Sequence, residues 1–421
     1  MKSEKSIGRG RGNSFFDFIG MLILALYCMN FLNKGIYIPL AIFPIILICL
    51  FALKYNPEFT LTLLTLTGFC VVYAVVHYFY HFSSKGIIIM YLTYPITLYV
   101  LGYIVTRGES KKMYQYLVVI IVSFTLVGFL SLMNTVSIYG DMTNAIQAFG
   151  GRRLVMNIWD NSLISATGIN TSLSFGLAML PIIFLKDKGN KKSNIVRVIA
   201  FLSFLASTYC VIQLGNRTGL GIIILSILVA FFLIHNNGKK ILVISTSVTI
   251  FFIMKIGFDK DILGIRSAWE TTLLYARLES AELGSDSRIT TWLDTLNGLV
   301  VNPMGGKETS ISITYAHNLW LDVAFEGGIF PFALLIIFTI ISIISLVQFQ
   351  KYKHPLILQG LVLTIITAFF ITFMVEPIIQ GWFTYFNIFC FIVGMMQRNN
   401  LGYRRNITND KFIEAYPVKW L

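Results

Sequence analysis

Residues 114–133 read YQYLVVIIVSFTLVGFLSLM, an apolar run without one charged side chain. The hydrocarbon core of a bilayer is about 30 Å thick, so a helix of about 20 residues crosses it. Backbone N–H and C=O groups find no water to bond there, and within a single segment only a helix satisfies them all. This stretch therefore predicts a membrane-spanning helix, and it decides the fold class.

Similar runs recur along the chain, which has 421 residues, 56% of them hydrophobic and 13% charged, with a net charge of +13. Length and hydropathy together predict about twelve transmembrane helices and an all-α polytopic membrane protein. The predicted spans are 15–32, 37–53, 59–80, 86–105, 114–133, 164–185, 196–215, 218–234, 240–257, 328–348, 357–375 and 381–397.

The placement of lysine and arginine orients these spans. If the N-terminus is cytoplasmic, most of the 33 basic residues fall in inner segments, although the outer segments include the two longest loops. The positive-inside rule then places both termini in the cytoplasm. The first span follows a basic segment but lacks a small-x-small cleavage site, which indicates an uncleaved helix. The basic balance follows from this topology, and no aromatic-basic pattern indicates nucleic acid.

Two long loops lie on the predicted outer side, at 134–163 and 258–317. Long loops within a compact architecture are usually functional. We therefore divide the chain into spans one to nine with the smaller loop, the large periplasmic loop, spans ten to twelve and a cytoplasmic tail. The corresponding boundaries are 1–257, 258–317, 318–397 and 398–421.

The large loop contains the segment SDSRITTWLDTLNGLVVNP at 285–303. Its apolar residues recur at helical spacing, polar residues 285–287 are candidate N-caps, and Pro303 closes it. This pattern predicts an amphipathic helix near the membrane face, with Arg288 in the first turn, where free N–H groups favour an anion. The alternative is an arginine that pairs with Asp286 or with a lipid headgroup.

Three further arginines on the predicted outer side are candidates for the site. Arg217 stands at the junction of two apolar spans, where a charge is costly and usually functional. The alternative is a packing arginine that ends a hairpin. Arg152 and Arg153 lie in the smaller outer loop. Because guanidinium groups match phosphate oxygens in bidentate pairs, arginines on this face indicate a pyrophosphate carried on a lipid.

His317 ends the large loop and opens the tenth span. An imidazole titrates near neutrality and can take a proton from a hydroxyl group as a general base. The alternative is a histidine that anchors the chain at the membrane interface. Asn318 beside it, and the Gly327–Gly328 pair, which lets backbone or substrate approach closely, favour the functional interpretation.

Other ionisable residues are open to more than one interpretation. His77 and His81 stand four apart, which suits a metal ion, but HYFYHF around them is typical of an aromatic belt at the outer interface. Asp322 and Glu326 either orient the site at His317 or are satisfied polar groups inside the bundle. The five cysteines form no C-x-x-C pair, so we expect neither disulfides nor a metal site.

Three segments, in this order around one large outer loop, resemble the bacterial O-antigen polymerase and O-antigen ligase superfamily. They are GNRTGLGIIIL from residue 215, SRITTWLDTLNGLVVNPMGG from 287 and HNLWLDVAFEGGIFP from 317. The resemblance is concentrated in residues 215–331. It implies an integral glycosyltransferase of the bacterial inner membrane that uses a glycan linked to undecaprenyl pyrophosphate as donor, without a cofactor.

Carried over to this chain, the resemblance implies that Arg217 and His317 belong to the active site, with Arg288 as the arginine of the loop helix. The implied reaction is a metal-independent inverting transfer, in which the arginines neutralise leaving-group charge on the pyrophosphate. His317 would orient or deprotonate the attacking hydroxyl of a second lipid-linked repeat unit. We expect six further residues to bind substrate: Arg152, Arg153, Asn216, Gly305, Gly306 and Asn318.

One position in the sequence favours a polymerase over a ligase. Ligases resemble a pattern of His, then Asn, Ser or Gln, nine free positions, Gly, two free positions, and Gly, Thr or Tyr. The chain follows this pattern from His317 to Gly328 but has Pro331 at the last place. A lipid-linked oligosaccharide flippase is the alternative of another class, although transporters often show two comparable halves.

The expected partners follow from the same resemblance. They are the lipid-linked donor and acceptor oligosaccharides, membrane lipids and a separate chain-length regulator, and no nucleic acid. The active site is expected on the periplasmic face of the inner membrane.

Overall fold

The computed structural model describes residues 12–52, 61–106, 108–185, 191–231, 256, 259–261, 265–279, 287–308, 310–311, 313–352 and 354–415. The model is mostly helical, and seven of its helices are long and apolar enough to cross a membrane. The prediction of an all-α membrane protein is confirmed to that extent. One departure is a two-stranded antiparallel hairpin of β1 (Leu154–Met156) and β2 (Leu163–Ser165).

The seven apolar helices coincide with seven of the predicted spans. They are Leu61–Phe79 (α3), Lys85–Thr106 (α4), Ser110–Tyr139 (α5), Ala166–Phe184 (which contains α7, Ala166–Leu177, and α8, Leu180–Phe184), Asn194–Leu214 (within α9, Lys191–Leu214), Ile329–Lys351 (α16) and Leu356–Val375 (α17).

The remaining predicted spans differ in outcome. Those at 15–32, 37–53 and 218–234 coincide with the shorter helices α1 (Gly12–Cys28), α2 (Ile38–Ala52) and α10 (Arg217–Phe231). The last, at 381–397, falls within the long helix α19 (Phe383–Ala415). The ninth, at 240–257, lies outside the described residues except for one position.

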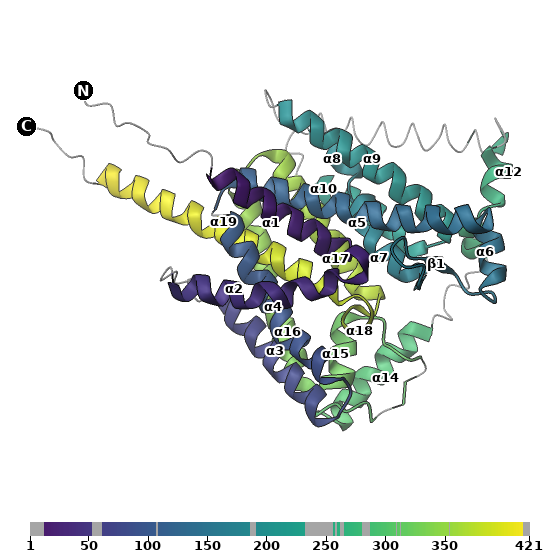
Figure 1. Ribbon diagram of the computed structural model, residues 1–421, viewed down its shortest axis with the longest axis horizontal. Coiled ribbons are helices and arrows are strands. Elements are labelled where there is room, and N and C mark those ends of the chain that lie inside the picture. Colours follow the sequence, from purple (N-terminus) through teal and green to yellow (C-terminus); the bar gives the residue numbers. More distant parts are fainter. Residues whose placement is uncertain are drawn as a thin grey trace, which may run out of the picture. The chain divides into compact units, whose positions relative to one another are not determined.

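Two compact units are formed from separated stretches of the chain, and Figure 1 shows their elements. The first comprises 1–123, 337–353 and 386–421. Within it, α4 packs against both α2 and α3, and two short 3-10 turns, η1 (Phe31–Asn33) and η2 (Gly35–Tyr37), lie between α1 and α2.

The second unit comprises 124–336 and 354–385, and it contains the candidates Arg152, Arg153, Arg217, Arg288 and His317. Helix α7 packs against α9, α10 and α17, which together form the framework of the unit. The hairpin leads into α7, whose N-cap Ser165 accepts a hydrogen bond from the Gly168 N–H. The short helices α6 (Met142–Ala148), α12 (Ile265–Glu270) and α13 (Leu273–Glu279) belong to the same unit, and α13 packs against α9.

Helix α14 (Ser287–Val301) confirms the helix expected in the large loop, and α15 (Leu319–Gly327) packs against it (Figure 1). Thr291 and Thr295 are buried, whereas four apolar side chains are exposed: Ile289, Leu293, Leu296 and Val300. The apolar face of α14 thus points away from the protein. Of its candidate N-caps, residues 285 and 286 lie outside the described residues.

Candidate functional site

Two arginines meet at the end of α9. Gly215, directly after this helix, has a φ of +60°, and its carbonyl accepts hydrogen bonds from Arg153 Nη1 at 3.3 Å and Arg277 Nη1 at 2.7 Å. Arg153 also donates to the Leu214 carbonyl at 3.0 Å. The last carbonyls of a helix lack intrahelical partners and carry the negative end of its dipole, so they hold cations well.

Arg217 stands two residues further on, as the first residue of α10. The side-chain oxygen of Asn216 accepts from the Thr218 N–H at 3.0 Å, which caps the start of this helix. Arg217 is exposed, and its charge acts on both Arg153 and Arg277. Asn216 therefore has a structural role at the site, as the residue that turns the chain from α9 into α10.

Electrostatics join a fourth arginine to these three. The pKa of Arg277 is lowered to about 10, mainly by burial and then by the charges of Arg153, Arg217 and Arg288. The pKa of Arg153 is lowered by burial and by Arg217. We call Arg153, Arg217, Arg277 and Arg288 the arginine cluster. Like charges held this close favour an anion between them, and guanidinium groups suit phosphate oxygens in particular.

A buried carboxyl group lies within the field of this cluster. Glu376 directly follows α17 as its C-cap and is 1% exposed. Burial raises its pKa to about 7, and the positive charges of Arg288 and Arg153 oppose this rise. Its Oε2 atom has no hydrogen-bond partner among the residues that the structure describes.

His317 is held in a fixed backbone turn. Its φ is +53°, a left-handed conformation that residues other than glycine seldom adopt. The Asp322 carboxylate accepts from the backbone N–H groups on both sides of it, Ala316 at 2.7 Å and Asn318 at 3.3 Å. Asp322 therefore orients the histidine through the backbone, as one of the two sequence interpretations expected.

Asn318 caps α15, since its side-chain oxygen accepts from Trp320 N and Leu321 N, both at 3.2 Å. Its amide nitrogen lies 3.7 Å from the sulfur of Met374, which is two residues from Glu376. Asn318 thus serves the local structure that brings His317 to the end of α17.

Helix α14 approaches His317 from another side. Trp292 Nε1 donates to the Ala316 carbonyl at 2.7 Å. Arg288 lies four residues before Trp292, so the two side chains share one face of α14. Together with the action of Arg288 on Glu376, these contacts bring the arginine cluster, Glu376 and His317 to the N-terminal end of α10 and the C-terminal end of α17.

Gly305 and Gly306 lie against α15, where their backbones make the contacts. A Cβ atom on Gly305 would lie 2.4 Å from Gly328 N, and the Gly306 N–H donates to the Glu326 carbonyl at 3.0 Å. The Glu326 carboxylate forms an ion pair with Lys307 at 2.6 Å and accepts from Gln380 Nε2 at 2.8 Å. Glu326 is thus a satisfied polar group that fixes this loop, as the other sequence interpretation expected.

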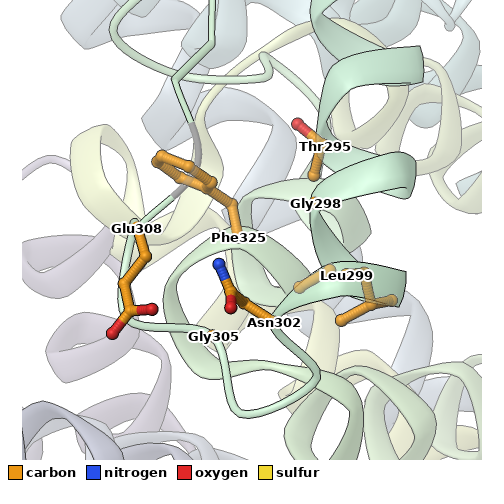
Figure 2. Close-up of a pocket in the computed structure, with 8 residues that line it drawn as sticks. Thr295, Gly298, Leu299, Asn302, Gly305, Glu308 and Phe325 are labelled. Carbon is orange, nitrogen blue, oxygen red and sulfur yellow. The ribbon is translucent and has the colours of Figure 1, made fainter.

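A small pocket, partly open to solvent, lies beside that loop. Figure 2 shows the Asn302 amide between Phe325 and Leu299, while the Glu308 carboxylate points away from them. Gly305 is the one residue expected from the sequence that lines this pocket.

The remaining candidates are placed elsewhere. Arg152 is exposed next to Arg153. In the first unit, His77 Nδ1 lies 2.9 Å from Ser83 Oγ, and aromatic rings of Tyr73, Phe82 and Tyr91 surround the imidazole. Across the part of the chain that the structure describes, no three His, Cys, Asp or Glu side chains are grouped as a metal ion would require.

Arg277 and Glu376 were not among the candidates from the sequence. Arg277 lies in a short helix with no recognisable motif, and Glu376 follows a span as an ordinary loop residue would. Neither signal exceeds that of many polar residues at the end of a helix.

Comparison with known proteins adds no family assignment. No protein-family model matches the chain, and no curated protein matches it.

Proposed function

We propose that this protein is a surface-polysaccharide polymerase of the O-antigen type, an integral glycosyltransferase of the bacterial inner membrane. The observation that carries the proposal is the convergence of the arginine cluster, Glu376 and the fixed His317 within one unit. Four guanidinium groups at one place suit a pyrophosphate, and a proton acceptor beside them suits transfer to a hydroxyl group.

The proposed donor is a glycan on undecaprenyl pyrophosphate, bound by the arginine cluster. The acceptor is the terminal sugar hydroxyl of a second lipid-linked repeat unit, oriented or deprotonated at His317. The hydroxyl oxygen attacks the anomeric carbon, and the bond from that carbon to the pyrophosphate oxygen breaks with its electron pair. The arginines stabilise the charge that develops on the leaving group, and the configuration is inverted.

The topology proposed with this function has about twelve spans, both termini in the cytoplasm and the site on the periplasmic face. The outward apolar face of α14 supports a position at the membrane interface, where Leu293 and Leu296 would contact lipid. The arginine cluster would then lie where a lipid presents its pyrophosphate. A chain-length regulator is the proposed protein partner.

Ligation of the glycan to the lipid A core is the second candidate. Pro331 lies in the first turn of α16, where a helix needs no N–H group from it, so proline is tolerated there. Pro331 departs from the ligase pattern but does not disrupt the helix. The agreement with that pattern from His317 to Gly328 keeps the ligase as the second candidate function.

The test is the surface-polysaccharide gel profile of a strain that lacks the protein, complemented with wild type or His317→Ala. A core capped by a single repeat, with a ladder restored by wild type alone, supports the polymerase. Bare core with accumulated lipid-linked polymer indicates the ligase. Repeat units retained on the cytoplasmic side indicate a flippase, and an unchanged ladder contradicts all three functions.

A further inference from the structure

One buried polar group on α7 and another at the C-cap of α17 have no role in the proposed reaction so far. Asn170 of α7 is 0% exposed, and neither its amide nitrogen nor its oxygen has a hydrogen-bond partner among the described residues. Glu376 Oε2 is also buried and has no hydrogen-bond partner among the described residues. A buried polar group without a partner destabilises the fold, so two of them near one site indicate a function.

The two groups lie at the same level of their helices. The Ser174 and Tyr385 hydroxyls are 2.7 Å apart, and Tyr385 donates to Thr372 Oγ1 at 3.3 Å, which bridges α7 and α17. Asn170 precedes Ser174 by four residues, and Glu376 follows Thr372 by four. Asn170 is therefore one turn from the bridge within α7, and Glu376, the C-cap of α17, stands one turn beyond the bridge along the chain.

The start of α7 and the end of α17 both lie near Arg153 of the arginine cluster. The Arg153 carbonyl accepts from the Ala166 N–H at the start of α7, and the charge of Arg153 acts on Glu376 at the end of α17. The start of α7 and the end of α17 consequently lie at the same end of the pair. Asn170 in α7 and Glu376 after α17 thus lie beyond the bridge, toward the same end of the two helices.

Glu376 is not neutralised by a direct ion pair. Among the described residues, no basic side chain lies within 4 Å of its carboxylate, so Arg288 and Arg153 act on it from further away. A carboxylate in direct contact with arginine would be a poor base. One that is held close to, but apart from, several arginines stays available to a substrate proton.

We propose that Glu376 is the catalytic base of the transfer, with Asn170 holding the acceptor hydroxyl and His317 positioning the acceptor sugar. This inference rests on the proposed function. In the step, the hydroxyl proton passes to a Glu376 oxygen as the new carbon–oxygen bond forms and the old one breaks toward pyrophosphate. The proton then leaves to solvent, which regenerates the carboxylate, and no other reactant is needed.

The pKa of Glu376, about 7, suits a base at neutral pH. The charges of Arg288 and Arg153 favour its ionised form, and a bound pyrophosphate would neutralise them. Donor binding therefore raises the proton affinity of Glu376 at the moment when a proton must be accepted. Glu376 is therefore a stronger base when the pyrophosphate donor is bound than when the site is empty.

The experiment measures elongation in spheroplasts of the polymer-producing strain, whose outer membrane face sees the buffer, between about pH 5.5 and 8.5. The charges that act on Glu376 are those of Arg288 and Arg153, and His317 precedes Asn318, whose amide contacts Met374, so variants must separate their effects. Wild-type elongation should rise with pH through about 7 and then level off.

Glu376→Gln should lower elongation by about 10²- to 10⁴-fold, with no alkaline rise, while the purified protein still binds undecaprenyl pyrophosphate. Glu376→Asp should restore part of the rate and the pH dependence. His317→Gln should lower the rate but keep the rise through about 7, and Asn170→Ala should behave likewise. The exposed Asp294→Asn is the matched control and should behave as wild type.

Two outcomes would overturn the inference while the proposed function stands. One is near-wild-type elongation by Glu376→Gln in a strain where Arg217→Ala elongates nothing. The other is loss of the alkaline rise in His317→Gln instead, which would make the histidine the base. If wild type and Arg217→Ala bind undecaprenyl pyrophosphate equally and the ladder forms without this protein, the proposed function itself fails.

Discussion

Arg153 and Arg277 donate to the same oxygen atom, the carbonyl of Gly215. One arginine precedes the β-hairpin and the other lies in α13, so the end of α9 gathers two charges from distant parts of the chain. This carbonyl neutralises neither charge, because it carries only a partial negative charge.

Arg277→Ala should lower elongation by about 10²-fold or more, because it removes one donor to the pyrophosphate. The rate is measured in membranes with equal amounts of protein. Arg266→Ala is the control, since Arg266 is exposed and pairs with Glu270 at 2.7 Å. Equal rates for both variants would remove Arg277 from the site.

Arg288 tests whether charge or geometry holds the anion. If charge dominates, Arg288→Lys should retain most of the elongation rate that Arg288→Ala loses. If a bidentate guanidinium pair is needed, both variants should lose it equally. The affinity for undecaprenyl pyrophosphate, measured on the purified variants, should follow the same order as the rates.

Stability should fall as pH rises from about 4 to about 7. Burial raises the pKa of Asp322 to about 7, chiefly by desolvation, and that of Glu376 likewise. A carboxyl group with a raised folded pKa binds its proton more tightly when folded, so its contribution is complete below the unfolded pKa and lost through the folded one.

Thermal unfolding in detergent at pH 5 and pH 8 checks this sign. Wild type should melt at a lower temperature at pH 8, and Asp322→Asn should reduce the difference because an amide does not ionise. The exposed Asp294→Asn should leave the difference as it is. A wild type more stable at pH 8 would contradict the prediction.

Gly328→Ala should destabilise the protein by about 1–3 kcal/mol or more. Gly328 has a φ of +77°, and a Cβ atom there would lie 2.4 Å from the Pro303 carbonyl oxygen. Thermal unfolding measures the loss. Gly221→Ala, in the interior of α10 with open space around it, should be neutral or slightly stabilising.

The sequence predicted the spans better than the contacts between them. Long apolar runs suffice to locate helices such as α5 and α16, because length and hydropathy are local properties. Arg217 and Arg288 became candidates for a similar reason, since a charge at a span junction or in a helix's first turn is visible in the chain itself.

Arg277 and Glu376 could not be found in this way. Their importance comes from burial and from neighbours more than sixty residues away, such as Gly215 for Arg277. The same limit explains Gly305, which was expected at a substrate and instead meets the backbone of Gly328. A glycine allows close approach by a substrate or by another backbone segment, and the sequence alone does not show which of the two it meets.

Because the residues of the candidate site come from distant parts of the chain, the site can form only after most of the chain has been synthesised. Arg153 and Gly215 are synthesised early, Arg277, Arg288 and His317 later, and Glu376 after most of the chain. A nascent chain that has threaded only its first helices into the bilayer holds isolated arginines and no acceptor for a proton. Under the proposed function, the site becomes competent only when α17 has been inserted and has brought Glu376 to the others, so an incomplete chain would be inert toward lipid-linked glycans.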